Sequence, residues 1–211
     1  MVGGTNNTVS DKDVFSGYYA DNDTILENKN EKIETSINRT YYLLSLSSYS
    51  FCLYGDILDY SFNDLKSPYI LAKNIENNEI KKNVYIINTF DSITSNKDAI
   101  DSKDPGENHD LKLFDGLDFV IMNRGNGNDA LLSVKNKIFS FAHVSLNEYE
   151  YNTSALEFIY ERMVCGGIIL IDDTGENIKG NTINNVAEDF MWDKEEPYIS
   201  LSTGQCFIIK S

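Results

Sequence analysis

The sequence predicts an α/β fold in which a doubly wound, mostly parallel sheet ends in an antiparallel hairpin. Two features carry this prediction. Residues 138–173 contain an apolar run, an amphipathic segment, a glycine pair and a second apolar run, which together are typical of a βαβ unit. Residues 198–211 contain two short apolar runs on either side of Thr203-Gly204, which is a hairpin signal. Because βαβ units build parallel sheets, only the hairpin is expected to be antiparallel.

The elements before the βαβ unit follow the same alternation. Apolar or β-branched runs at 55–59, 83–87 and 117–122 predict the first three strands. Residues 36–49 predict a helix that packs Tyr and Leu side chains on the sheet, and residues 62–77 predict a second helix. Strands and helices therefore alternate along most of the chain, as a doubly wound sheet requires.

The βαβ unit has the clearest expected boundaries. An apolar run over 138–144 predicts the fourth strand. Leu156, Ile159 and Met163 then recur at helical spacing, which predicts that all three lie on the buried face of one helix. The glycine pair at 166–167 is expected to end this helix and lead into the fifth strand.

The remaining segments are polar. Residues 1–30 are rich in Asn, Asp, Gly, Ser and Thr, and we expect a polar N-terminal arm followed by a single domain over 31–211. Residues 92–116 predict a long loop or a short lid, and long loops in compact domains are often functional. Residues 182–192 predict a last helix before the hairpin.

Composition limits the possible partners and location. The 211 residues suffice for one sizeable domain, and the formal net charge of −15 argues against nucleic acid or an anionic membrane surface as partner. No apolar run is long enough to span a membrane, and no signal peptide is evident. Cys52, Cys165 and Cys206 are scattered in apolar stretches and are expected to be reduced core residues. These features fit a cytoplasmic protein.

The expected topology places several acidic and polar residues at one edge of the sheet. The fifth strand, residues 168–171, stops on Asp172 and Asp173. In open α/β sheets, ligands bind outside the carboxyl ends of the strands. We therefore expect Asp59, Asn88 and Asp172 to lie at this edge.

Each of these residues also has a plain structural interpretation. His143, at the end of the fourth strand, fits a catalytic base because imidazole titrates near neutral pH, but it fits a satisfied core histidine equally well. Asp172 and Asp173 fit a Mg²⁺ site, because hard cations prefer carboxylate oxygens, and they also fit a solvated strand end. Asp59 is either a ligand-binding residue or an ordinary strand-end acid.

The order of elements resembles class I S-adenosylmethionine (SAM)-dependent methyltransferases, which are Rossmann-like, and in particular the macrocin (macrolide-sugar) O-methyltransferase group. The resemblance covers residues 54–210, and the last three of its motifs are specific in their order and spacing. The matching pieces are Gly55-Asp56-Ile57-Leu58-Asp59, Asn88-Thr89-Phe90-Asp91, the run from His143 to Tyr149, the run from Cys165 to Asp173, and Thr203-Gly204-Gln205 with Lys210.

This resemblance implies a methyl transfer from SAM to a hydroxyl group of a sugar or small molecule, and possible homo-oligomers. It implies that His143 and Asp172 are catalytic and that Asp172 and Asp173 bind Mg²⁺, which would lower the pKa of the hydroxyl. The cofactor-binding residues that it implies are Asp59, Ser61, Asn88, Thr89 and Phe90.

The sequence departs from the family pattern at three places. The expected turn at 60–64 lacks the family's glycines, whose absence crowds a close backbone approach to the cofactor. Asn88 stands where the family has an acid that grips the ribose, and Ser145 stands where the family has an acid that serves as metal ligand or base. The alternative function is therefore a catalytically inactive homologue that serves as a binding or interaction module.

Overall fold

A computed structural model describes residues 37–62, 65–89, 112–125, 127–145, 149–172 and 186–211. These residues belong to one unit, Ile37–Ser211. The expected N-terminal arm and most of the expected loop at 92–116 lie outside the described residues, so the domain boundary at residue 31 stays a prediction.

The core of the described unit is a seven-stranded sheet with the order β3-β2-β1-β4-β5-β7-β6. Neighbouring strands from β3 to β5 are parallel, whereas β7 is antiparallel to both β5 and β6. The predicted mostly parallel sheet with a C-terminal antiparallel hairpin is thus confirmed. The strands are β1 (Asp56–Phe62), β2 (Val84–Thr89), β3 (Val120–Gly125), β4 (Phe139–Ser145), β5 (Met163–Asp172), β6 (Tyr198–Ser200) and β7 (Cys206–Ile209).

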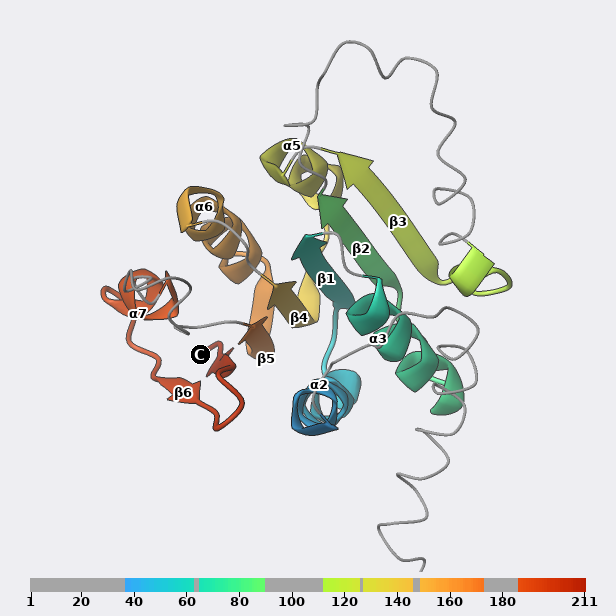
Figure 1. Ribbon diagram of the computed structural model, residues 1–211, viewed down its shortest axis with the longest axis horizontal. Coiled ribbons are helices and arrows are strands. Elements are labelled where there is room, and N and C mark those ends of the chain that lie inside the picture. Colours follow the sequence, from blue (N-terminus) through green and yellow to red (C-terminus); the bar gives the residue numbers. More distant parts are fainter. Residues whose placement is uncertain (1–36, 63–64, 90–111, 126, 146–148, 173–185) are drawn as a thin grey trace, which may run out of the picture. The chain divides into compact units, whose positions relative to one another are not determined.

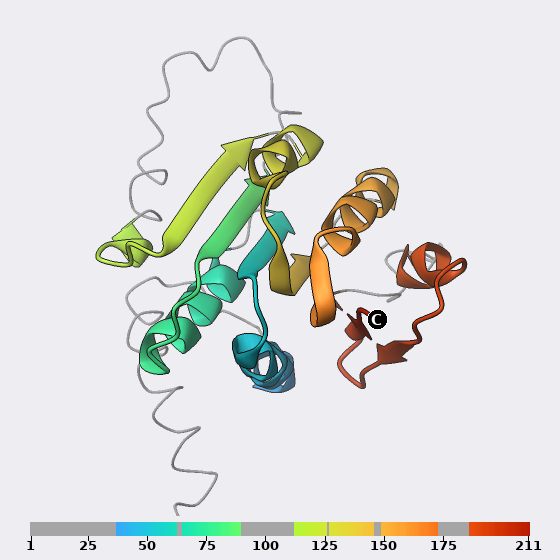
Figure 2. The same cartoon turned by 180° about the vertical axis from the view of Figure 1, so that it is seen from behind.

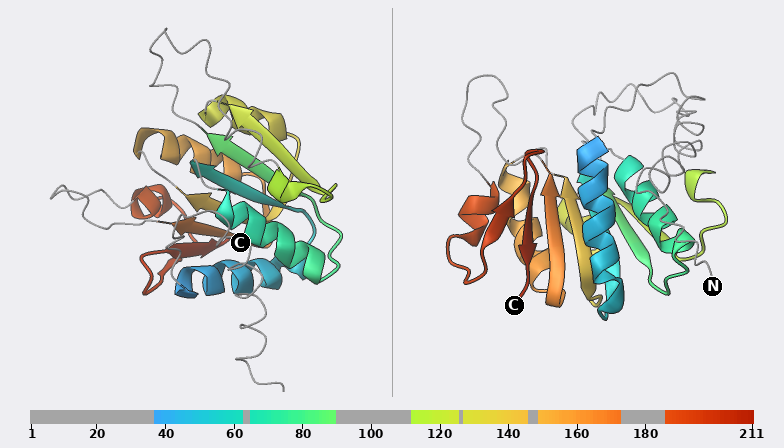
Figure 3. Two further views of the ribbon diagram at one scale, coloured as in Figure 1. Left: turned by 45° about the vertical axis from the view of Figure 1, so that its right-hand side comes forward. Right: turned by 90° about the horizontal axis from the view of Figure 1, so that it is seen from below.

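Helices cover both faces of this sheet, as Figures 1 and 2 show from opposite sides. The helices α2 (Ile37–Tyr49) and α3 (Lys66–Asn77) pack on one face, where Leu43 and Leu71 meet Ile57 and Phe141. Figure 3 shows these two helices in front of the strands. The opposite face is covered by α5 (Gly127–Leu131), α6 (Tyr149–Tyr160) and α7 (Val186–Met191).

Short 3₁₀ turns join some of these elements. They comprise Ser50–Cys52 after α2, Lys112–Phe114 before β3, and Leu132–Val134 after α5. Because helices cover both faces, the sheet is doubly wound. The helix predicted over 36–49 is confirmed as α2.

The structure moves several of the expected boundaries, among them the start of the second helix, which is Lys66 instead of residue 62. Helix α6 ends at Tyr160, and Met163 begins β5 instead of continuing the helix. The glycine pair 166–167 lies inside β5, where the pairing with β4 shifts register. A positive φ of 79° at Gly166 marks this irregularity, which a glycine adopts without steric cost.

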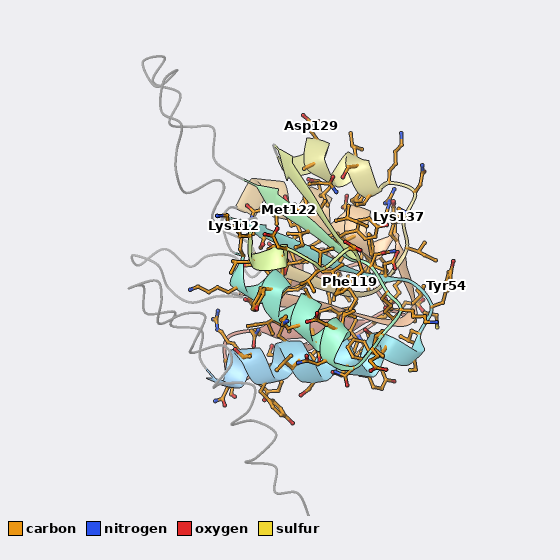
Figure 4. All side chains as sticks on the ribbon, turned by 90° about the vertical axis from the view of Figure 1, so that its right-hand side faces the viewer. Tyr54, Lys112, Phe119, Met122, Asp129 and Lys137 are labelled. Carbon is orange, nitrogen blue, oxygen red and sulfur yellow. The ribbon has the colours of Figure 1, made fainter. Side chains whose placement is uncertain are left out.

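The third strand also begins later than expected. Leu117 lies before β3, which runs from Val120 to Gly125 and forms one edge of the described sheet. Figure 4 looks at this edge, with Phe119 and Met122 labelled. The strand also ends later than expected, at Gly125, and Gly127 begins α5.

Lys82 holds the amino ends of the central strands together. Its side chain is buried, and Nζ donates hydrogen bonds to the carbonyl oxygens of Leu53 and Gly55 and to the hydroxyl of Ser140. Burial lowers the pKa of Lys82, while the carboxylate of Asp56 opposes that change. The amino edge is thus fixed by structural contacts, opposite the edge where ligands of α/β sheets bind.

The expectation for the cysteines was wrong for two of them. All three are free thiols, but only Cys206 is buried, whereas Cys52 and Cys165 are exposed. Their apolar neighbours in sequence misled the prediction, because Cys52 lies in a surface turn and Cys165 lies beside the β5 irregularity. Within the described ranges, no helix is both long and apolar enough to cross a membrane.

Candidate functional site

The strand register aligns polar residues across four parallel strands near their carboxyl ends. Asn88, Ser61, Ser145 and Asp172 are consecutive register partners on β2, β1, β4 and β5. Asp59 and His143 are also register partners, and each lies two residues before Ser61 or Ser145 on the same strand. Because residues two apart in a strand share a face, both sets of partners belong to the same face of the sheet.

That face changes from apolar to polar along each strand. Ile57 and Phe141, two residues before Asp59 and His143, pack against α2 and α3. The opposite face stays apolar to the strand ends, with Val144 and Ile171 in its core. On β1 and β4, polar residues therefore enter the face covered by α2 and α3 only at the carboxyl end.

The predicted edge is confirmed for Asn88 and Asp172, which are the second-to-last residue of β2 and the last residue of β5. Asp59 lies deeper, because β1 continues to Phe62 instead of stopping at residue 59. Residues 60–62 of the expected turn therefore belong to β1. Residues 63–64 of this turn lie outside the described part of the chain.

His143 lies between two carboxylates. Its Nδ1 is 2.8 Å from Oδ2 of Asp59, and its Nε2 is 3.2 Å from Oδ2 of Asp172. The side chains of His143 and Asp59 are only 1% and 0% exposed, while that of Asp172 is 14% exposed. Asp172 is therefore the member of this triad that reaches the surface.

The triad shifts the pKa values of its members. Burial alone would lower the pKa of His143, but the carboxylates of Asp172 and Asp59 outweigh burial and raise it well above its usual value. Burial alone would raise the pKa of Asp172, but His143 and the amide of Gln205 outweigh burial and lower it. The geometry thus favours a charged imidazole ring beside an ionised Asp172.

Further hydrogen bonds extend the triad into β1 and the C-terminal hairpin. The hydroxyl of Ser61 donates to Oδ1 of Asp59 at 2.7 Å, and Nε2 of Gln205 donates to Oδ1 of Asp172 at 2.5 Å. The hydroxyl of Thr203 then donates to Oε1 of Gln205 at 2.9 Å. Gln205 is itself buried, so its amide is committed to these partners.

Helix α2 joins the same network through its first turns. Nη2 of Arg39 donates to the carbonyl oxygen of Thr203 at 3.1 Å. Sequence reasoning did not assign Arg39 or Gln205 to the site. Gln205 had a signal, because Thr203-Gly204-Gln205 is one of the matching motifs, but Arg39 precedes the region of resemblance.

The described residues do not fit the Mg²⁺ site that the resemblance implies. Both oxygens of Asp172 already accept hydrogen bonds, one of them from a cationic ring, and the neighbouring Ser145 offers a hydroxyl where a carboxylate was expected. Within the described ranges, no three His, Cys, Asp or Glu residues are grouped so that they could hold a metal ion. Asp173, the other implied ligand, lies outside the described residues.

The described residues suit a hydroxyl-bearing cofactor better than a metal ion. Ser61 and Asn88 are register partners at the carboxyl ends of adjacent strands, and a hydroxyl and an amide both exchange hydrogen bonds with ribose hydroxyls. Thr89 ends β2 beside them, while Phe90 lies outside the described residues.

Solved structures with similar folds are methyltransferases. CalS11, a TDP-rhamnose 3′-O-methyltransferase of calicheamicin biosynthesis, superposes in its apo form with a TM-score of 0.61 at 15% identity, over 95% of each chain. The O-methyltransferase NovP gives a TM-score of 0.63 at 12% identity, over 83% of this chain and 81% of its own. Cofactor-bound Rv0187 from MTB gives 0.60 at 14% identity, over 97% of this chain and 92% of its own.

Comparisons of sequence give no such similarity, because no protein-family model and no curated protein matches this chain. At these low identities, the structural similarities establish the fold. The chain has the class I SAM-dependent methyltransferase fold, while its place in the macrocin group stays a prediction.

Proposed function

We propose that this chain binds SAM at the carboxyl ends of β1 and β2 and methylates a hydroxyl group of a sugar or small molecule. One observation carries the proposal: polar side chains on the face covered by α2 and α3 gather at the carboxyl edge of the sheet. The chain shares this fold with CalS11, a sugar O-methyltransferase. That edge is where ligands of open α/β sheets bind.

Asn88 is the proposed partner of the cofactor's hydroxyl groups, and Ser61 lines the same site beside it. Asn88 offers an amide in place of a carboxylate, so its hydrogen bonds lack the strength that a charge adds. Ser61 offers a hydroxyl where a glycine would leave room for the cofactor. We therefore expect weaker SAM binding than in a protein with an acid and a glycine at these positions.

SAM, when bound, would supply an electrophilic methyl group to the acceptor oxygen, with S-adenosylhomocysteine as the leaving group. The acceptor hydroxyl must lose its proton, and the Asp172 carboxylate is the partly exposed group of the triad that can receive it. Both ring nitrogens of His143 already face carboxylates. We therefore propose that His143 positions Asp172 and does not itself accept the proton.

Isothermal calorimetry with SAM and with S-adenosylhomocysteine tests cofactor binding. We expect Asn88→Asp together with Ser61→Gly to tighten binding about tenfold or more, because this pair restores a charged acceptor and removes a side chain. Ser202→Ala, at an exposed residue of the hairpin, is the matched control. Equal affinity in the parent and the double variant would contradict the cofactor placement.

Transfer is tested with methyl-tritiated SAM and a panel of nucleotide sugars and phenols. A product that carries a labelled methyl group on oxygen supports the proposed activity, provided that Asp172→Asn does not form it. SAM binding without transfer to any acceptor of the panel would instead favour the second candidate, a catalytically inactive binding module. That candidate is favoured by the hydrogen bonds that already engage both oxygens of Asp172.

A further inference from the structure

The imidazole ring of His143 occupies an unusual place, because it bridges two carboxylates that come from strands on either side of β4. Asp59 lies on β1 and Asp172 on β5, and each directs an oxygen at a different ring nitrogen. An ionised carboxylate only accepts hydrogen bonds, so both ring nitrogens must donate. A ring with two N–H donors carries a positive charge.

The other oxygen of each carboxylate also accepts a hydrogen bond. Oδ1 of Asp59 accepts a hydrogen bond from Ser61, and Oδ1 of Asp172 accepts one from Gln205. The site therefore already contains two carboxylates, one cation between them, and neutral donors outside them. A divalent cation that approached Asp172 would meet a ring of the same charge about one hydrogen-bond length away, with little solvent to screen it.

We propose that His143 supplies at this edge the positive charge that a divalent cation would supply, and that Asp59 and Asp172 therefore do not take up Mg²⁺. This inference deepens the proposed function and rests on it only in treating this edge as the active site. The side chain at residue 145 completes the arrangement. Ser145 lies beside Asp172 in the register and adds no third carboxylate, so the positive ring faces two negative charges and not three.

Titration with Mn²⁺, followed by electron paramagnetic resonance, tests the inference on the full chain. We expect no saturable binding that depends on Asp172 up to about 1 mM Mn²⁺, which exceeds the dissociation constants of most built carboxylate sites. Asp172→Asn should give the same background as the parent. Saturable binding in the parent that Asp172→Asn abolishes would overturn the proposal.

A pair of matched variants tests the role of the ring. Ser145→Asp adds a carboxylate but keeps His143, whereas Ser145→Asp with His143→Asn adds the carboxylate and removes the ring. We expect the double variant to bind Mn²⁺ at least about tenfold more tightly than Ser145→Asp, because a cation no longer competes for Asp172. Equal affinities, with circular dichroism showing both variants folded, would contradict the proposal.

Nitrogen-15 spectra keep the proposal testable if His143→Asn fails to fold. The chain has two histidines, His109 and His143, so His109→Asn leaves His143 as the single imidazole. At pH 7.5 we expect both ring nitrogens of His143 to carry a proton, and a neutral ring would overturn the proposal. None of these experiments measures SAM binding or methyl transfer, so failure of the proposed function and failure of this inference are distinguishable.

Discussion

Single residues at the carboxyl edge link the stability of the fold to pH. The pKa of His143 is raised in the folded protein, so its stabilising contacts are fully present below its unfolded pKa, near 6.5, and are lost as the pH rises through its folded pKa. Asp172 has the opposite sign. Its pKa is lowered from 3.8, so its contribution is present above that value and is lost as the pH falls through its folded pKa.

We therefore expect the free energy of unfolding to fall on the alkaline side of neutrality because of His143. Urea denaturation between about pH 6 and pH 9 measures this slope, and His143→Asn should flatten it. Burial and Glu196 raise the pKa of Tyr160, which lies outside the triad. Tyr160 is present in both the parent and His143→Asn, so it does not account for a difference between their slopes. The same slope in the parent and the variant would show that folding does not raise the pKa of His143.

Gln205 tests the outer half of the network. Gln205→Leu removes the donor to Oδ1 of Asp172 and leaves a mostly buried, charged oxygen with one partner fewer. We expect a loss of about 1–3 kcal/mol in the free energy of unfolding. Ser202→Ala, three residues earlier and exposed, should change it by less than about 0.5 kcal/mol. A Gln205→Leu variant as stable as this control would mean that the amide contributes nothing to the fold.

At the residue scale, sequence reasoning found the three members of the triad but not the contacts between them. Asp59, His143 and Asp172 were each singled out, since strand-end polar residues are visible in the sequence. The bridge between them was not predictable, because it depends on the register of β1, β4 and β5. One residue of slip in any strand would turn its side chain to the opposite face.

At the scale of elements, the irregularity in β5 shows how two glycines shape the strand that carries Asp172. A Cβ atom at residue 167 would lie 2.8 Å from the carbonyl oxygen of Val164, which is closer than real Cβ contacts. Gly167 therefore allows the chain to pack beside its own backbone as β5 changes its pairing with β4. From the sequence, the glycine pair was interpreted as a helix end. Helix ends and strand irregularities both favour glycine, so the sequence alone does not distinguish them.

Gly167→Ala should be destabilising, because backbone atoms cannot move aside as flexible side chains do. We expect a loss of about 2 kcal/mol or more in the free energy of unfolding. Gly116→Ala is the comparison, since residue 116 has a positive φ of 82° but no atom within 4 Å of a new Cβ. Strain alone should cost that variant about 1 kcal/mol. A smaller loss at residue 167 than at residue 116 would show that β5 rearranges around the methyl group.

Elements with strong periodicity were predicted well, and those defined by tertiary contacts were not. Helix α2 and strands β2 and β4 begin and end within about two residues of their expected bounds. Strand β3 was placed three residues too early, because the apolar Leu117, just before Phe119, extends the run into a turn. The five-residue helix α5 was missed, since its start at Gly127 lies in a glycine- and asparagine-rich stretch.

At the scale of the whole molecule, the polar arm and the domain are expected to be independent. Deletion of residues 1–30 removes few apolar side chains, so we expect the urea midpoint of the remaining chain to stay unchanged within error. Sedimentation of the parent and the deletion variant at several concentrations would also test the predicted self-association. A lower midpoint after deletion would show that the arm packs on the domain.

The order in which the chain is made gives the network of the carboxyl edge a further meaning. Arg39 and Thr203, which share a hydrogen bond, are 164 residues apart, and Asp59 is made 84 residues before His143. Gln205 lies 33 residues after Asp172 in the sequence, so their hydrogen bond can form only after those residues have been synthesised. Contacts of such high sequence separation form slowly, and a chain made from its N-terminus builds β1, β2 and β4 well before the hairpin exists. The contacts of Thr203 and Gln205 are therefore the last of the site that can form during synthesis.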